Sequence, residues 1–205
     1  MKVEQAAARL GRAARQRKAA SRRLQALPHL WLLTDPERTA DPIAAAAGLP
    51  RGAAVVYRAF GAADRWATAR ALRRLTRERG LKLLIGADWR LAAAAGADGV
   101  HLPERLMGQA PRLRRYRPNW LISAAAHDRA AITAAGRMGL DAILVSAVFP
   151  SDSPSAGRPL GPVRFAALAA RTGVPVIALG GVNETTAPRL LSSRAAGLAG
   201  VGFRL

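Results

Sequence analysis

Eight polar side chains stand where short apolar runs of the sequence end, and their types are the ones that could do chemistry. They are Thr34, Asp35, Arg58, Asp88, His101, His127, Ser146 and Ser151. Imidazole titrates near neutrality, so a histidine can take a proton from one atom and return it to another. Arginine stays charged and can hold an anion, but it cannot serve as a base. The set therefore indicates acid–base chemistry on an anionic substrate.

Residues that are missing from the sequence exclude several mechanisms. There is no cysteine, which excludes disulfides, thiolate metal sites and a cysteine nucleophile. The only lysines are Lys2, Lys18 and Lys82, and Lys82 stands at the start of an apolar run, away from the candidate residues. A Schiff-base lysine is therefore not expected. No Walker loop and no G-x-G-x-x-G motif occurs, so nothing supports a nucleotide cofactor.

The spacing of the apolar runs predicts the elements that position these side chains. From residue 30 onward, eight runs alternate with Ala/Leu/Arg segments of helical length. The runs cover Leu30–Asp35, Ala53–Phe60, Leu81–Ala87, Gly99–Leu102, Asn119–Ala126, Asp141–Phe149, Val174–Gly181 and Gly197–Phe203. Continuous apolar strands are typical of a parallel sheet covered by helices. We predict an α/β fold of the (β/α)8 TIM-barrel class, with a doubly wound open sheet as the alternative.

Capping residues mark where the intervening helices begin and end. Asp41-Pro42, Asp64 and Asp128 have the types that open helices, and Gly48, Gly80 and Gly139 have the type that closes them. Asn183 can cap the segment that follows the seventh run.

The N-terminal residues 1–27 predict a basic amphipathic helix, which we separate from a barrel over residues 28–205. One apolar stripe is formed by Val3, Ala6, Leu10, Ala13, Ala20, Leu24 and Leu27. The chain stops directly after the eighth run, so we expect this helix to pack on the barrel in place of the last helix. A frayed basic tail is the alternative.

The stretch "ALGGVNE" (Ala178–Glu184) is the clearest phosphate signal. Paired glycines after a strand let the backbone approach a ligand, and the start of a following helix offers free N–H groups. Barrels of this class commonly hold phosphate in the loops after strands seven and eight. We therefore predict a phosphate site at Gly180, Gly181, Gly200, Gly202 and Ser151.

The composition of the chain limits the kinds of molecule that the protein is expected to bind. The net charge is +19, yet all but three of the 32 basic residues are arginines, and they are scattered without an aromatic-rich RNA-binding signature. We expect a phosphorylated small molecule as the partner, and no nucleic acid. No run reaches the roughly 20 apolar residues of a membrane span, and no signal peptide precedes the barrel, so a cytoplasmic protein is expected. A homodimer is left open.

The order of six motifs resembles the thiamine-phosphate synthase and thiazole tautomerase family. They are "LWLLTD", "VVYRAFG", "GADGVHL", "AAAHD", "LVSAVFPS" and "VIALGGVN", between about Leu30 and Val201. The resemblance implies a (β/α)8 barrel that binds a thiazole phosphate. The synthase joins it to a pyrimidine pyrophosphate with Mg²⁺, whereas the tautomerase isomerises a thiazole carboxylate phosphate.

The synthase's reacting residues are only partly present in this resemblance. Its Q-x-R-x-K pattern reads Val56, Tyr57, Arg58, Ala59, Phe60 here, so only the arginine remains. Its Asn-Asp pair falls on Gly86 and Ala87, with Asp88 one position late, and its second metal carboxylate falls on Leu106. The lysine that normally follows "VFPT" is absent near Ser153 and Pro154. Both magnesium carboxylates are therefore missing.

His127 is the residue that matches the acid/base histidine of the tautomerase branch. We predict a tautomerase-like isomerase in which His127 and Arg58 are catalytic, Thr34, Asp35 and Asp88 orient the substrate, and no metal is bound. His101 is interpreted as structural, and Asp35, Asp88 and His127 have simpler alternative roles at turns and helix starts. The alternatives are a divergent Mg²⁺-dependent synthase, a non-catalytic phosphate-metabolite binding protein, and a metal hydrolase using His101, His127 and Asp88.

Overall fold

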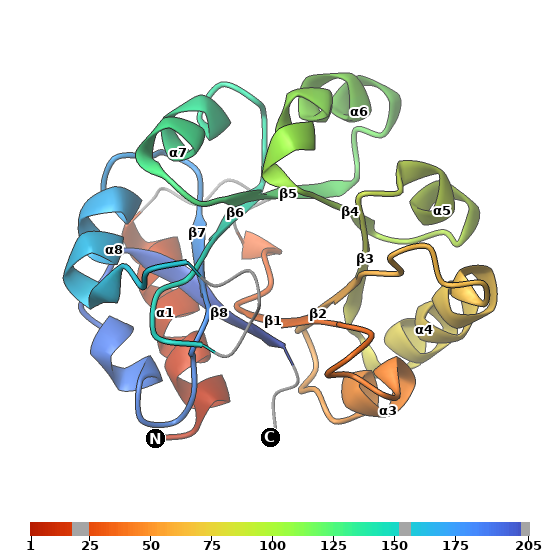
Figure 1. Cartoon of the computed structure of the whole chain (residues 1–205), viewed down its shortest axis with the longest axis horizontal. Helices are drawn as coiled ribbons and strands as arrows, with labels where there is room; N and C mark the ends of the chain where they lie inside the picture. Colours follow the sequence, from red (N-terminus) through yellow and green to blue (C-terminus); the bar gives the residue numbers. More distant parts are fainter. Residues whose placement is uncertain (18–24, 152–156, 202–205) are drawn as a thin grey trace.

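Eight parallel strands close into a barrel in the computed structural model, which describes residues 1–17, 25–151 and 157–201. Each strand pairs with the next, and the eighth pairs with the first (Figure 1). The strands are β1 (Leu30–Leu33), β2 (Ala54–Tyr57), β3 (Lys82–Gly86), β4 (Gly99–Leu102), β5 (Leu121–Ala126), β6 (Ala142–Val145), β7 (Val176–Leu179) and β8 (Ala195–Val201). The predicted barrel is confirmed, because each strand lies within or overlaps the apolar run that predicted it.

Alternate strand residues supply two layers of core, because successive side chains of a strand point to opposite faces. Leu30, Leu32 and Val55 pack outward with buried helix residues such as Leu72 and Leu91. The intervening positions fill the interior of the barrel: Trp31, Leu33, Ala54, Val56, Leu84, Ala142, Leu144, Ile177 and Ala199. This double burial explains why the strands read as continuous apolar runs rather than as alternating ones.

Helices surround the strands (Figure 1). They are α1 (Val3–Arg17), α3 (Pro42–Ala47), α4 (Arg65–Arg79), α5 (Trp89–Ala94), α6 (Ala110–Tyr116), α7 (Arg129–Ala135) and α8 (Gly161–Ala169), with 3₁₀ helices η1 (Glu104–Gln109) and η2 (Ala187–Leu190). The Asp41 side chain caps α3, and Gly80 ends α4 in the left-handed conformation. α7 already ends at Ala135, and Gly139 follows it in a left-handed turn. None of the described helices is long and apolar enough to cross a membrane.

Helix α1 packs against β8 and β1, where Figure 1 shows it beside the blue last strand. Gly11 permits this close approach, since a Cβ there would lie 2.8 Å from His29 Cβ. The buried face includes Leu10 and Ala14, whereas Ala13 of the predicted stripe is only half-buried. Side chains project along a 3.6-residue period, which rotates the contact from Ala13 to Ala14. Ala20 and Leu24 of the predicted stripe lie outside the described residues.

Two carboxylates tie neighbouring strands together at the amino end of the barrel. Asp98, before β4, pairs with Arg73 of α4 and Lys82 of β3 at 2.7 and 3.3 Å. Asp141, before β6, pairs with Arg114 of α6. Each carboxylate also accepts a backbone N–H from the preceding strand, at 2.9 Å from Leu83 and 2.8 Å from Ile122. These contacts fix β3 beside β4 and β5 beside β6.

Candidate active site

Arg58, Thr34 and Asp35 form one hydrogen-bonded group at the carboxyl ends of β1 and β2. The Arg58 Nε donates to the Thr34 carbonyl at 2.6 Å, and its Nη2 donates to Asp35 Oδ2 at 3.0 Å. The Thr34 hydroxyl accepts the Arg58 backbone N–H at 3.0 Å. Arg38 also bonds the Asp35 carboxylate, and this hydrogen bond, with smaller help from the Arg58 charge, lowers the Asp35 pKa. Asp35 is therefore ionised at neutral pH and holds Arg58 in place.

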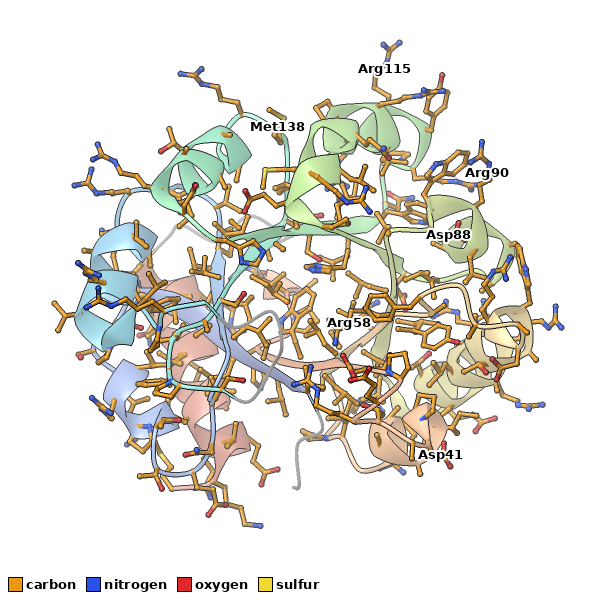
Figure 2. All side chains as sticks on the ribbon, in the orientation of Figure 1. Asp41, Arg58, Asp88, Arg90, Arg115 and Met138 are labelled. Atoms are coloured by element: carbon orange, nitrogen blue, oxygen red, sulfur yellow. The ribbon has the colours of Figure 1, made fainter. Side chains whose placement is uncertain are left out.

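A pocket of about 160 Å³ lies beside this group. Its lining includes Thr34, Asp35, Tyr57 and Arg58. In Figure 2, Arg58 lies toward the inside of the ring of strands, whereas Asp88 lies farther out beside α5. Nη1 of Arg58 has no partner among the described residues, which leaves this nitrogen to meet an anion.

His101 of β4 lies buried and bonds Ser123 of β5, with 3.0 Å between Nδ1 and Oγ. Burial lowers the pKa of His101 to about 4, and the nearby charges of Arg58 and His127 lower it further in the same direction. The imidazole is therefore neutral at working pH. This placement agrees with the expected structural role of His101.

His127 lies exposed at the end of β5, where its ring meets Ser146 at the end of β6. The His127 Nδ1 is 3.3 Å from the Ser146 hydroxyl and 3.5 Å from the Ser146 carbonyl. The backbone N–H of His127 donates to the Glu104 carboxylate at 2.7 Å. Glu104 therefore positions the backbone that carries the imidazole. The sequence pattern did not single out Glu104, because this residue precedes His127 by 23 positions and stands in the "PERL" stretch after β4 without a motif of its own.

Asp88 caps helix α5, and its Oδ1 accepts the Leu91 N–H at 2.9 Å. Helix capping is therefore a sufficient role for the Asp88 carboxylate, without any contact to a substrate. Ala87, which stands where the resemblance to the synthase implies a metal-binding Asp, has a left-handed backbone with φ of 62°. Among the described residues, no group of three His, Cys, Asp or Glu side chains could hold a metal ion. The metal-hydrolase alternative therefore has no support in this part of the chain.

The paired glycines after β7 let two loops meet. Gly180 and Gly181 have φ of 94° and 63°. A Cβ on Gly180 would lie 2.9 Å from the Ala147 Cα, and one on Gly181 would lie 2.3 Å from the Pro150 carbonyl oxygen. The glycines are thus required by the approach of the β6 loop, whatever they bind. Ser151 follows Pro150 directly in that loop.

The expected helix start after β7 is wrong in its details. The segment forms a turn and the short 3₁₀ helix η2, rather than an α-helix. The Asn183 Oδ1 accepts the N–H groups of Thr185 and Thr186 at 2.9 and 3.0 Å, so these donors are already paired. Gly200 lies inside β8 opposite Leu32, and Gly202 lies outside the described residues. Among the described residues of the predicted phosphate site, the backbone around Gly180 and Gly181 remains the candidate.

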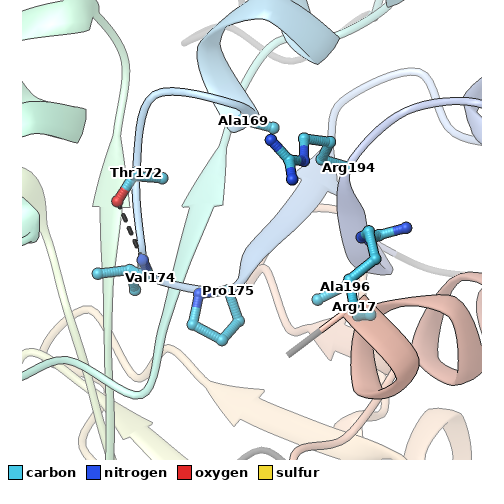
Figure 3. A pocket seen from close by; sticks show the side chains of 8 residues that line it. Arg17, Ala169, Thr172, Val174, Pro175, Arg194 and Ala196 are labelled. Atoms are coloured by element: carbon cyan, nitrogen blue, oxygen red, sulfur yellow. Dashed lines mark hydrogen bonds between the residues drawn. The ribbon is translucent and has the colours of Figure 1, made fainter. Parts of the chain in front are cut away.

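A second pocket, of about 120 Å³, lies at the opposite end of the barrel (Figure 3). Arg17, Arg194 and Thr172 line it, near the amino ends of β7 and β8. The Arg17 guanidinium donates to the Ala195 carbonyl at 3.3 Å, and burial followed by the Arg194 charge lowers its pKa. Arg17 thereby ties α1 to β8, and none of the predicted site residues lines this pocket.

The barrel and its polar carboxyl end define a (β/α)8 protein whose candidate site is built from the residues that follow its strands. The chain belongs to the thiamine monophosphate synthase family, whose match covers residues 30–202. The resemblance inferred from the six motifs is thereby confirmed.

Individual relatives agree with this assignment. A Geobacter sulfurreducens protein with a provisional thiamine-phosphate synthase name is 42% identical over 132 residues, 64% of this chain and 62% of that protein. A thiamine-phosphate synthase from Chloroflexus aurantiacus is 33% identical over 75% of this chain and 72% of its own length. The solved structure of thiamine phosphate pyrophosphorylase from Pyrococcus furiosus is similar with a TM-score of 0.72, at 25% identity over 86% of each chain. The match thus spans less than two thirds of the Geobacter relative.

Proposed function

We propose that this chain is an enzyme of thiamine biosynthesis that acts on a thiazole phosphate at the carboxyl end of the barrel. The first candidate reaction is that of its named relatives, the joining of thiazole phosphate to a pyrimidine pyrophosphate. The observation that carries this proposal is the family match, which runs through all eight strands. The relatives described above are named for this synthase and not for an isomerase, so the comparisons favour it over the tautomerase.

In this reaction the bond from the pyrimidine's carbon to its pyrophosphate breaks, and a bond to the thiazole nitrogen forms. Negative charge grows on the leaving oxygen, and groups fixed in advance around that charge lower the barrier. Arg58 is held by Thr34 and Asp35 and can meet a phosphate oxygen with Nη1. We assign His127 the transfer of a proton to the leaving pyrophosphate oxygen. The backbone at Gly180 and Gly181 would receive the thiazole's phosphate.

Magnesium, which the family resemblance implies for the synthase, does not fit the described residues. Mg²⁺ takes carboxylate and phosphate oxygens at near-octahedral positions. The two positions that would supply carboxylates are Ala87 and Leu106, and Asp88 already uses its Oδ1 for the capping bond to Leu91. No step of the proposal therefore depends on a metal held by this chain.

The second candidate is the isomerisation of a thiazole carboxylate phosphate. One observation favours it: the acid/base histidine of the tautomerase branch is present as His127, exposed and bonded to Ser146, while the synthase's metal carboxylates are absent. A proton shuttle needs an anchored phosphate and an imidazole, and it needs no pyrophosphate chemistry. A barrel that only binds the phosphate is the outcome if neither reaction occurs.

Product analysis separates these outcomes. The purified chain is incubated with thiazole phosphate and pyrimidine pyrophosphate, and separately with the thiazole carboxylate phosphate, each with and without Mg²⁺. Formation of thiamine phosphate supports the first candidate, and formation of the isomer supports the second. Binding of thiazole phosphate by calorimetry without either product would show a non-catalytic protein. Absence of both binding and turnover would refute the proposed function.

A further inference from the structure

Phe60 is an exposed aromatic residue in an unfavourable backbone conformation at the carboxyl end of β2. The residue is 68% exposed, and its φ is 45°. Positive φ is uncommon for residues other than glycine, and it is a genuine outlier for bulky side chains. Burial of the ring does not offset this cost, because most of its surface faces water. Strained residues of this kind cluster at ligand-binding sites.

The Phe60 ring belongs to the same corner as the candidate catalytic side chains. The Arg58 Cζ lies 5.2 Å from the ring centroid, within the range of a cation–π contact. Arg58 in turn passes over β3, since a Cβ on Gly86 would lie 3.1 Å from the Arg58 Cγ. Arg58 also lines the pocket beside Thr34 and Asp35 at the carboxyl ends of β1 and β2. Through this contact with Arg58, Phe60 lies next to the candidate site.

We propose that Phe60 is a specificity-determining residue that stacks on the heteroaromatic ring of a phosphorylated ligand. The inference deepens the proposed function and rests on it for the thiazole or pyrimidine identity of that ring. Arg58 lies over the ring on one side, and the large exposed fraction leaves surface for a planar ligand. Offset stacking of two aromatic rings adds affinity beyond simple burial. A phosphate on the same ligand can then reach Arg58 Nη1.

The residue type at position 60 indicates which part of a ligand it would meet. Phenylalanine offers a flat apolar face and no charge, so Phe60 would act on the ring of a ligand rather than on its phosphate. We therefore expect selection among phosphates by the aromatic character of the group they carry.

The test compares ligands of equal charge in the intact chain by titration calorimetry. The probes are thiazole phosphate, a pyrimidine monophosphate and glycerol phosphate. The wild type should bind at least one heteroaromatic phosphate about fivefold or more tightly than glycerol phosphate, since stacking of a base on an aromatic side chain contributes roughly 1–3 kcal/mol and 1.4 kcal/mol is tenfold. Phe60→Ala should abolish this preference and leave glycerol phosphate binding unchanged. Phe60→Trp should keep it.

Two further variants separate stacking from folding. Phe60→Gly should lose the preference as Phe60→Ala does, yet melt at a higher temperature than Phe60→Ala, because glycine adopts positive φ without strain. Tyr116→Ala is the matched control, because Tyr116 is 71% exposed and Arg112 lies 5.7 Å from its ring on the outer helix α6. It should leave every affinity unchanged.

The outcomes distinguish this inference from the proposed function. A wild type without preference for heteroaromatic phosphates, or a preference that survives in Phe60→Ala, overturns the stacking role. A Phe60-dependent preference for the pyrimidine phosphate, together with no binding of thiazole phosphate, supports the stacking role and contradicts the proposed function.

Discussion

The two ends of the barrel use their polar side chains in opposite ways. At the amino end, Asp98 and Asp141 each bind a cation and a backbone N–H, and their side chains are only 18% and 6% exposed. At the carboxyl end, the exposed His127 Nδ1 contacts only Ser146, at 3.3 Å from its hydroxyl and 3.5 Å from its carbonyl among the described residues. At the amino end the carboxylates stabilise neighbouring strands, whereas at the carboxyl end the His127 imidazole is accessible to solvent.

This difference separates residues that stabilise the barrel from residues that could act on a ligand. In barrels of this class, reacting groups lie at the carboxyl ends of the strands. Arg58 has features of both groups: Thr34 and Asp35 bind its Nε and Nη2, and no described residue bonds its Nη1. Substitutions at the two ends should therefore change different measured quantities.

The largest effect is expected at the amino end. Asp141→Ala removes the partner of Arg114 and the acceptor of the Ile122 N–H. Breaking a buried ion pair by removing one partner typically costs about 3–5 kcal/mol. We expect a loss of this size in the free energy of unfolding, measured with urea. Affinity for phosphate at the far end should be unchanged in the folded variant.

Asp141→Asn is the control, because an amide can still accept the Ile122 N–H while it loses the charge. It should fall between the wild type and Asp141→Ala. A loss below about 1 kcal/mol for Asp141→Ala, the size typical of a surface pair, would contradict the assigned role.

His101 should make stability depend on pH. Its pKa is about 4 in the folded chain and near the ordinary 6.5 in the unfolded chain, so between these values the unfolded state binds more protons. Stability is therefore complete above pH 6.5 and is lost as pH falls toward 4, by about 3 kcal/mol from this group. His101→Gln should flatten the urea-unfolding profile in this window. His29, whose pKa burial also lowers, leaves a smaller slope of the same sign. Equal slopes in both proteins would refute the assignment.

The sequence predicted the architecture well because strand burial and caps leave local signals. The eight runs located all eight strands, and Asp41 and Asp128 cap helices with their side chains as predicted. Asp64 stands directly before α4, but its side chain makes no capping hydrogen bond. The prediction of an α-helix after β7 was wrong for a local reason. Asn183 folds its side chain over the N–H groups of Thr185 and Thr186, and only a single 3₁₀ helix follows.

Contacts between distant segments could not be predicted in the same way. Glu104 reaches His127 across 23 residues, and Asp35 reaches Arg58 across the same separation. No periodicity or cap signal marks such pairs. The left-handed backbone conformation of Phe60 likewise depends on the turn after β2. The residue type, phenylalanine, does not predict that conformation.

A smaller effect is expected from Asp88, which belongs to the carboxyl end by position and acts as a helix cap. Asp88→Ala should cost about 1 kcal/mol of unfolding free energy, as for other N-caps. It should leave turnover and its dependence on Mg²⁺ unchanged, because the carboxylate bonds the Leu91 N–H. Asp41→Ala is the matched control, since Asp41 caps α3 in the same manner. A changed Mg²⁺ requirement in Asp88→Ala alone would show that this carboxylate serves a metal.

The most direct test of the account is the turnover of His127→Ala in whichever thiazole phosphate reaction the wild type performs. General acid–base catalysis contributes about 10²–10⁴-fold, so the account predicts at least about a hundredfold loss of turnover. Affinity for thiazole phosphate and the unfolding midpoint should stay at wild-type values, because the ring is exposed and the phosphate is held elsewhere. Turnover within about threefold of the wild type would contradict the claim that His127 carries the proton transfer at the carboxyl end of this barrel.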